Sequence, residues 1–487
     1  MANKHASLDA LFADIANAIR EKTGDTGTIP TAEFPSMIRE RLEVIPPLPY
    51  LTFNSPSSFT LAVNDATKHW DGTLEYSTDT STWATWDGTT TISSATSGSN
   101  NVLYLRGTGN TVITGNNINY KWVLTGSNIK CIGNIENLLD YATVETGAHP
   151  TMATSCYQYM FNACTSLTKA PDLPATTLAN NCYRGMFYVC TSLTKAPALP
   201  ATTLVNDCYH SMFYNCTSLT QAPPLPATTL ANNCYDSMFQ ECTGLTKASA
   251  LPATTLAPKC YQAMFRGCTS LTQAPTLPAT TLANYCYNYM FSGCTALTQA
   301  PSLPATTLAS SCYQFIFRNC TSLTQAPSLP ATTLVDYCYY GMFSGCTSLT
   351  QAPALPATTL ASNCYQSMFS GCTSLTQAPA LPAMTLAANC YYSMFDGCTS
   401  LTQAPALPAT TLKVYCYAFI FRGCTSLKLS PTQTGEYTIA YRIPTTGTGT
   451  TAMSALTDMF ISTGGTFTGT PEINTTYYLS NTNTVVD

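Results

Sequence analysis

Cysteine recurs in this chain at a fixed interval of 26 residues, and that regularity restricts the fold to a repeat architecture. One series runs from Cys156 to Cys416, a second lies eight residues further on, and of the 23 cysteines only Cys131 falls outside both. The chain contains 11 copies of the unit CYxxMFxxCTSLTxAPxLPATTLAxx, which together cover residues 156–429. A period of this length is typical of solenoids, in which neighbouring copies stack and share one core.

The unit itself predicts a short helix, a very short strand and an extended stretch. Its apolar residues recur four apart, with a second set one place later, which is close to helical periodicity. The segment CTSLT suits a strand, but the prolines that follow it remove donors from every rung and limit pairing to two or three residues. We expect the apolar positions and their equivalents at 26-residue steps to form the structural core. In the first copy these are Cys156, Tyr157, Met160, Phe161, Cys164 and Leu167.

Charged residues are scarce throughout, which excludes two classes of protein. They make up 9% of the 487 residues, with 20 Lys and Arg in all and a net charge of -5. So few cations cannot form the basic surface of a nucleic-acid-binding protein, and disordered chains are richer in charge. No apolar run reaches the roughly 20 residues that cross a bilayer. Acids at Asp9 and Asp14 stand where a signal peptide has its apolar region, so we expect a soluble chain without a secretion signal.

The run MFxxCTSLTxAPxLPATTL, over about residues 150–429, resembles the BspA-type leucine-rich repeats. Their pattern is AFxxCxSLTxIxIPxSVTxIG, and this chain differs in having Met for Ala, an added residue near the prolines, and Cys-Tyr at the start of the unit. The resemblance implies a leucine-rich-repeat-type solenoid. Because such repeats occur in adhesins and other surface-binding proteins, it also implies binding rather than catalysis.

Both ends of the array have the features of caps. Residues 129–155 are expected to cover the first repeat. Residues 430–487 combine a Thr/Gly-rich insertion with a degenerate copy in which Met459 and Phe460 match the MF pair and Thr463 replaces the second cysteine. A terminal repeat that loses core residues is expected at a solenoid end. The apolar residues of the N-terminal cap are Cys131, Ile135, Leu138 and Leu139.

Residues 46–128 differ in composition and predict an antiparallel β-sandwich. Alternating runs are separated by turn signals such as WDG and GTGN. The runs are 59–63, 73–77, 102–106, 111–113 and 122–124. All four tryptophans lie here, and they form either a sugar-stacking platform or part of the core. They are Trp70, Trp83, Trp86 and Trp122.

Residues 1–45 predict a helical segment followed by the stiff linker IPPLP. Ser7 is a suitable N-cap, and Leu8, Leu11, Phe12 and Ile15 begin an apolar stripe. The stretch LDALFADIANAIREKTGDTGTIPTAEFPSMI resembles the N-terminal segment of phage and prophage tail-associated proteins. That resemblance implies attachment to a virion or self-association, with a homotrimer as the expected oligomer. The alternative is a helical hairpin folded onto its own chain.

No residue pattern predicts catalysis, a metal site or a cofactor. The regularly spaced cysteines are expected to be buried free thiols rather than disulfides or zinc ligands, because zinc sites show paired CxxC or Cys/His spacing. His210 lies two residues from Cys208, but a nucleophilic cysteine needs an open, electropositive setting. A polysaccharide depolymerase would need paired carboxylates. The array carries a few acids at differing repeat positions: Asp172, Asp207, Asp236, Glu241, Asp336 and Asp396.

Variation between copies indicates where a ligand would bind. The third, fourth, seventh and eighth positions of the unit, and the residue before it, mix aromatic residues with Arg and small polar residues. That mixture is typical of adaptable recognition surfaces, although it also suits tolerant solvent positions. The candidate ligand-binding residues are Tyr159, Tyr188, Tyr214, Tyr285, Tyr289, Phe315, Arg318, Tyr337, Tyr340, Tyr392 and Tyr415; Arg184, Arg266, Phe419 and Arg422 belong to the same variable set.

The expected fold is α+β and modular: short N-terminal helices, a β-sandwich, and a solenoid of 26-residue units with short strands and short helices. The expected function is non-enzymatic recognition by a phage tail or virion-surface protein, assembled in the host cytoplasm, that binds a host-cell surface glycan or protein. Other virion proteins would be partners of the N-terminal segment. The alternatives are a structural virion fibre or head-decoration component, a depolymerase, and a bacterial adhesin.

Overall fold

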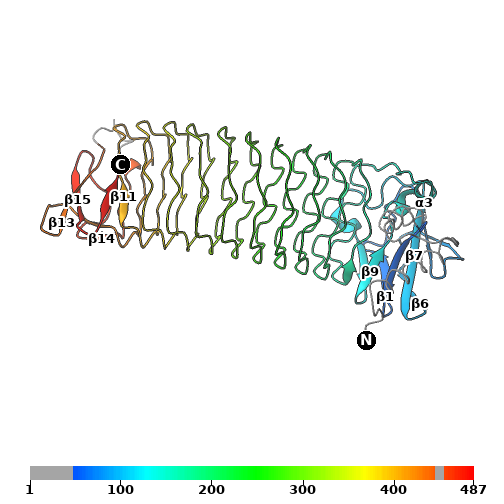
Figure 1. Cartoon of the computed structure of the whole chain (residues 1–487). Coiled ribbons are helices and arrows are strands. Elements are labelled where there is room, and N and C mark those ends of the chain that lie inside the picture. The colour runs from blue at the N-terminus through cyan, green and yellow to red at the C-terminus, as the bar shows by residue number, and fades with distance from the viewer. Residues whose placement is uncertain (1–47, 445–453) are drawn as a thin grey trace, which may run out of the picture.

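The computed structural model describes residues 48–444 and 454–487, so the predicted helical segment 1–45 lies outside them. The repeats form an elongated stack of coils, one 26-residue coil to a repeat, between a strand-rich unit at the N-terminal end and a smaller strand-rich cap at the C-terminal end (Figure 1). A single α-helix, α3 (Asn137–Glu145), lies wholly within the described residues. The described chain is therefore mostly β and turn rather than α+β.

Between its two cysteines each coil forms a run of turns, so the predicted short helix is wrong. Successive backbone amides donate alternately to a carbonyl of the same coil and to a carbonyl of the next coil. The Met160 amide donates to the Tyr157 carbonyl three residues back (3.2 Å), whereas the Phe161 amide donates to the Met186 carbonyl of the next coil (2.9 Å). A helix would direct every amide to the carbonyl four residues earlier. Apolar residues four apart fit a four-residue turn as well as a helix, so their periodicity does not distinguish the two.

Outside the turn segment, each coil forms only isolated β-bridges with the neighbouring coils, as the prolines predict. Parallel bridges join Gln221 to Lys247 and Thr203 to Thr229, and both recur at 26-residue steps along the stack. Regular strands of three residues occur only near its ends, at β10 (Leu167–Lys169) and β11 (Gln403–Pro405). Proline cannot donate to a ladder, so the pairing stops where the Ala-Pro stretch begins.

The core of the stack consists of columns of identical side chains. Tyr157 stacks on Tyr183 with ring centroids 5.6 Å apart and planes 3° from parallel, and Phe161 stacks on Phe187 at 5.6 Å. Each phenylalanine of the column is fully buried, which contributes roughly 1.5–3 kcal/mol relative to exposure. Cysteine, methionine and leucine fill the columns between the rings, and all 23 cysteines are buried free thiols.

The N-terminal unit contains two sheets. One has the order β10-β9-β1-β7-β3-β4, with β6 paired to β7, and the other has the order β5-β2-β8. Of the predicted runs, 111–113 is not a strand. The strands are β1 (Leu51–Ser55), β2 (Thr60–Val63), β3 (Thr73–Ser77), β4 (Ala84–Trp86), β5 (Ile92–Ser93), β6 (Ala95–Ser97), β7 (Asn100–Thr108), β8 (Trp122–Thr125) and β9 (Ile129–Ile132), with a short 3-10 helix at Ile118–Tyr120.

This unit is joined to the first coil by a continuous sheet and a shared core. Strand β9 pairs antiparallel with β1 and parallel with β10 of the first repeat, so the sheet crosses the predicted boundary at residue 128. Trp122 donates its amide to the Met160 carbonyl (2.8 Å) and accepts the Cys164 thiol at its own carbonyl (3.3 Å). The unit therefore supplies the backbone partners that a preceding coil would supply.

Three of the four tryptophans belong to this core rather than to a surface platform. Trp70 contacts Trp86 at 5.2 Å between centroids, Trp86 contacts Trp122 at 5.5 Å, and all three are buried. Trp83 is half-buried, with the Arg106 guanidinium 4.0 Å above its ring. The apolar residues expected to cap the first repeat, Cys131 and Ile135 with Leu138 and Leu139 of α3, are likewise fully buried.

The C-terminal cap continues the coil pattern before it closes the stack. Phe460 stacks on Phe421 at 5.6 Å, and the Phe421 amide donates to the Met459 carbonyl (3.1 Å), as the match to the MF pair predicts. The last strand then folds back to pair in parallel with β11. The strands of the cap are β12 (Lys428–Ser430), β13 (Tyr437–Arg442), β14 (Gly464–Gly465), β15 (Thr476–Ser480) and β16 (Thr484–Val486). None of the helices in the described residues is long and apolar enough to cross a membrane.

Candidate binding surface

Three columns of residues on the turn side of the stack have left-handed backbone conformation in all 11 coils. They are the residue before the first cysteine and the residues three and seven places after it. In the first coil they are Ser155, Tyr159 and Ala163, with φ of 61°, 56° and 63°. We call them the left-handed columns. Asn, Ser and Gly predominate in them, because these residues tolerate positive φ at little cost.

Aromatic residues occupy the left-handed columns at seven places, although positive φ is unfavourable for a bulky side chain. The left-handed conformation costs an L-residue roughly 1–2 kcal/mol. Such outliers cluster at functional sites, where a side chain is held for a purpose other than stability. The seven are Tyr159, Tyr285, Tyr289, Phe315, Tyr337, Tyr415 and Phe419, with φ from 51° to 59°.

Five aromatic residues from neighbouring coils form a group that we call the central cluster: Tyr285, Tyr289, Phe315, Tyr337 and Tyr340. Tyr289 stacks on Phe315 with centroids 4.8 Å apart, and Phe315 contacts Tyr340 at 4.6 Å. Tyr340 in turn contacts Tyr337 at 6.0 Å. Tyr285 and Tyr337 are exposed, at 38% and 39%, and the other three are half-buried. The cluster thus presents two exposed tyrosines and three half-buried aromatic side chains on the turn side of the stack.

Cations lie over the rings of this cluster. The Arg318 guanidinium carbon is 5.2 Å from the centroid of Phe315, and that of Arg266 is 5.3 Å from the centroid of Tyr289. Lys259 places its Nζ 5.7 Å from the Tyr285 centroid. Of these cations, Lys259 was not among the sequence candidates. Its place in a left-handed column, one coil before Tyr285, is the signal that would have identified it.

The remaining candidate residues lie in two other groups. Tyr188 and Tyr214 stack at 4.4 Å in the second and third coils. Tyr392 contacts Phe419 at 5.5 Å and Tyr415 at 6.3 Å near the C-terminal end. Candidate Tyr159 lies apart from these groups: its ring covers Gly185 of the next coil, where a Cβ would meet it at 2.2 Å.

A cluster of polar side chains in the second to fourth coils does not resemble a catalytic site. Burial lowers the pKa of His210 to about 4 and raises the pKa of Asp236 to about 6. The His210 Nδ1 lies 3.3 Å from Asp207, which also pairs with Arg184 at 3.4 Å. The neighbouring Cys208 is fully buried, and burial raises the pKa of its thiol well above the ordinary value, whereas a nucleophile needs the opposite shift. The described residues contain no group of three or more metal-binding side chains.

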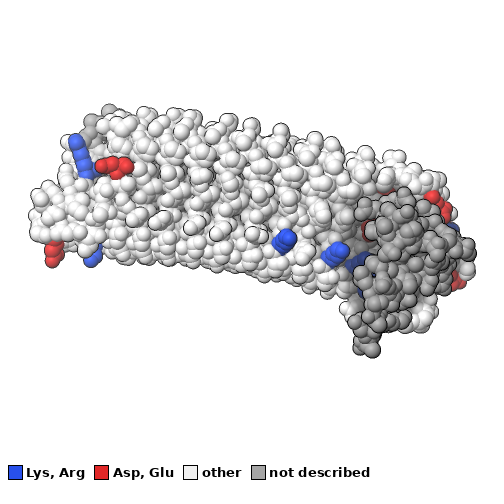
Figure 2. Space-filling view, viewed as in Figure 1, with Lys and Arg blue, Asp and Glu red and all other residues white. Residues whose placement is uncertain are grey.

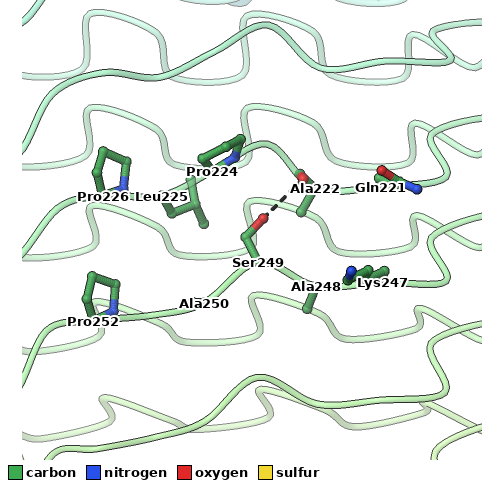
Figure 3. A pocket seen from close by; sticks show the side chains of 10 residues that line it. All are labelled: Gln221, Ala222, Pro224, Leu225, Pro226, Lys247, Ala248, Ser249, Ala250 and Pro252. Carbon is green, nitrogen blue, oxygen red and sulfur yellow. Dashed lines mark hydrogen bonds between the residues drawn. The ribbon is translucent and has the colours of Figure 1, made fainter.

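A hollow of about 550 Å³ separates two coils on the proline-rich side of the stack (Figure 3). Ser249 stands where most repeats have proline, and its hydroxyl donates to the carbonyls of Ala222 (3.1 Å) and Pro223 (2.6 Å). Proline, alanine and leucine form most of the wall, and Gln221 and Lys247 are its other polar residues. The hollow therefore offers little chemistry for fixing a ligand.

Charge is sparse on the face of the stack seen in Figure 2, where charged side chains lie mainly toward the two ends. A family model of the BspA-type leucine-rich repeat region, which is six copies long, matches residues 141–272, 232–376 and 284–428. These matches span more than half of the chain. The chain belongs to the BspA-type leucine-rich repeat family. A comparison with curated proteins finds no match. Its BspA-type repeats carry the left-handed columns, and these hold most of the candidate aromatic residues.

Proposed function

We propose that the chain is a non-enzymatic recognition protein that attaches to a cell-surface glycan or protein through the aromatic residues of its turn side. The observation that carries the proposal is the placement of Tyr289, Phe315 and Tyr337 at φ of 54° to 59°. Asn, Ser or Gly would be the less strained choice at each position. A side chain kept at a cost to folding is best explained by a contact outside the chain.

The chemistry of the central cluster suits a sugar or a flat protein epitope. Aromatic faces carry negative charge density and attract the C–H groups on one side of a pyranose ring. Tyrosine adds a hydroxyl that can exchange hydrogen bonds with a ligand, and it loses little side-chain entropy on binding. Because the groups recur along one rod, several weak contacts would act together on a repetitive surface.

We also propose that the chain is part of a virion, and this rests only on the resemblance of its N-terminal segment to phage tail-associated proteins. Residues 1–45 would attach the chain to other virion proteins or join three copies, and the stack would reach the host cell. Electron microscopy of particles labelled with an antibody to the chain tests this part separately. Labelling of a tail or of the capsid surface supports it, and a chain found on bacterial cells without particles contradicts it.

Binding of the full chain to a panel of intact bacterial strains tests the recognition function. The variant Tyr289→Ser/Phe315→Ser adopts residues that the same column has in other coils, such as Ser211 and Ser237. We expect strain-selective binding that this variant loses by tenfold or more. A matched control, Gln299→Ala/Gln325→Ala, alters exposed residues on another side of the same two coils and should bind normally.

Other outcomes distinguish the alternatives. If the wild type and the aromatic variant bind equally, or neither binds any strain, the stack is a spacer, as in a structural fibre or head decoration. Release of soluble sugar during incubation, abolished by changing a carboxylate, would establish a depolymerase instead.

A further inference from the structure

The three cations beside the central cluster are not held in ion pairs by the residues that the structure describes. Lys259, Arg266 and Arg318 are exposed, and none of them takes part in an ion pair among the described residues. By contrast, Arg184 and Arg422, at comparable positions in other coils, each pair with an aspartate. The positive charge of the central cluster is thus available to a ligand, whereas that of the other groups is neutralised within the chain.

The acids nearest to these cations lie one coil earlier, and Asp236 is close enough to Lys259 for the two charges to interact. From residue 259 to residue 395 the chain has four charged side chains, of which Asp336 alone is acidic. Its carboxylate accepts a hydrogen bond from the Ser362 amide (3.0 Å). One coil before Arg266, the Glu241 carboxylate packs against Gly267. The cluster therefore has exposed guanidinium groups, those of Arg266 and Arg318, that no ion pair neutralises, in a chain whose net charge is -5.

Cations and aromatic faces alternate over a short distance. Arg266 and Arg318 occupy the same column two coils apart, which is about 10 Å at the usual spacing of neighbouring strands. Arg266 lies over the ring of Tyr289 and Arg318 over the ring of Phe315, and these two rings stack on each other. Such an arrangement matches an extended acidic sugar chain in which the carboxylate of every second ring faces the stack. Three separated cations are too few for the dense phosphates of a nucleic acid.

We propose that the central cluster binds an acidic glycan, with Lys259, Arg266 and Arg318 contacting its carboxylates and the aromatic rings contacting its sugar faces. This inference rests on the proposed recognition function and names its ligand class. Because the cations are exposed, their contribution is screened by salt. Guanidinium groups can hold a carboxylate with two parallel hydrogen bonds, which gives specificity beyond net charge.

Binding of the full chain to immobilised polygalacturonate tests the proposal. Its fully methyl-esterified form is the matched probe, since it keeps the sugar backbone and lacks the charge. We expect binding to the acidic form to be at least tenfold tighter, and to weaken as NaCl rises from about 0.05 M to about 0.5 M. Arg266→Gln/Arg318→Gln should reduce binding to the acidic form at least tenfold. Arg184→Gln, which alters an ion-paired arginine of the same variable set, should have little effect.

The outcomes separate this inference from the proposed function. If both probes bind equally and the arginine variant behaves as wild type, while Tyr289→Ser/Phe315→Ser loses binding to cells, the recognition function stands and the acidic ligand is wrong. Equal binding of a single-stranded oligonucleotide would show general polyanion binding and overturn the proposal. Absence of binding to polygalacturonate and to polysialic acid would overturn it as well.

Discussion

The Cys190 thiol donates a hydrogen bond to the Phe161 carbonyl of the preceding coil, at 3.0 Å, and the same bond recurs in every later coil. The carbonyl also accepts the Cys164 amide three residues later (3.0 Å), and the second cysteine of the unit is small enough to fill the core and still reach the same oxygen. Cysteine at this position is therefore both a core residue and a backbone partner.

Replacing one of these cysteines should weaken the whole stack. In Cys294→Ala the Phe265 carbonyl loses one of its two donors, keeping the Cys268 amide (3.1 Å), and a small cavity forms, so we expect a loss of about 1–2 kcal/mol in the free energy of unfolding. Urea unfolding followed by circular dichroism measures the change. Gln299→Ala, on the surface of the same coil, is the control, and equal midpoints for the two variants would contradict the role assigned to the thiol.

Alkaline pH should unfold the protein. Burial raises the pKa of the Cys182 and Cys320 thiols from the ordinary 9.0 to about 12. Because the folded state holds these protons more tightly, their contribution to stability is complete below pH 9 and is lost as pH rises toward 12. The thermal midpoint should be level from about pH 7 to about pH 8.5 and should fall steeply above pH 9. A midpoint that stayed constant to about pH 11 would mean that the thiols ionise freely in the folded state.

Substitution at an aromatic left-handed position should not destabilise the chain. Tyr337 is 39% exposed with φ 59°, and other coils have asparagine at this position, as at Asn363. We expect Tyr337→Asn to leave the free energy of unfolding unchanged or to raise it by up to about 1 kcal/mol. Tyr339→Asn, two residues away in the buried tyrosine column, should instead cost about 3 kcal/mol or more. If both variants lose several kcal/mol, Tyr337 is a structural residue.

The Trp122 side chain should couple the N-terminal unit to the stack. It is buried against Trp86 and Phe161, so Trp122→Ala should cost about 3–5 kcal/mol. Hydrogen exchange of the first coil, residues 156–166, should accelerate more than exchange of the central coils. Uniform acceleration along the chain would show that the two parts unfold as one unit.

Much of the fold follows from the sequence, but one element does not. The period, the core columns and the cap at Met459–Phe460 can be read from spacing alone, because stacked copies place residue i beside residue i+26. The turn segment has the sequence pattern of a short helix, because apolar residues four apart suit both structures. The distinguishing sign is the Gly, Asn and Ser at every fourth place, as at Asn215 and Gly267.

The candidate site was predicted only in part. Alignment of the copies identifies the variable aromatic residues, and the 26-residue step brings Tyr289 next to Phe315. Their strained backbone and the missing ion pairs of Arg266 and Arg318 depend on local geometry, which spacing does not reveal. Alignment of the copies places Lys259 in the variable position before the first cysteine, but its position over the Tyr285 ring depends on local geometry.

The hydrogen bonds between coils run along the rod, and that direction sets its response to tension. When the two ends are pulled apart, bonds such as that from Phe161 to Met186 are stretched along their length and break one rung after another, instead of shearing together. Each coil that opens releases 26 residues, or roughly 90 Å of extended chain. A rod built in this way lengthens in steps and dissipates work when the surfaces at its ends are drawn apart.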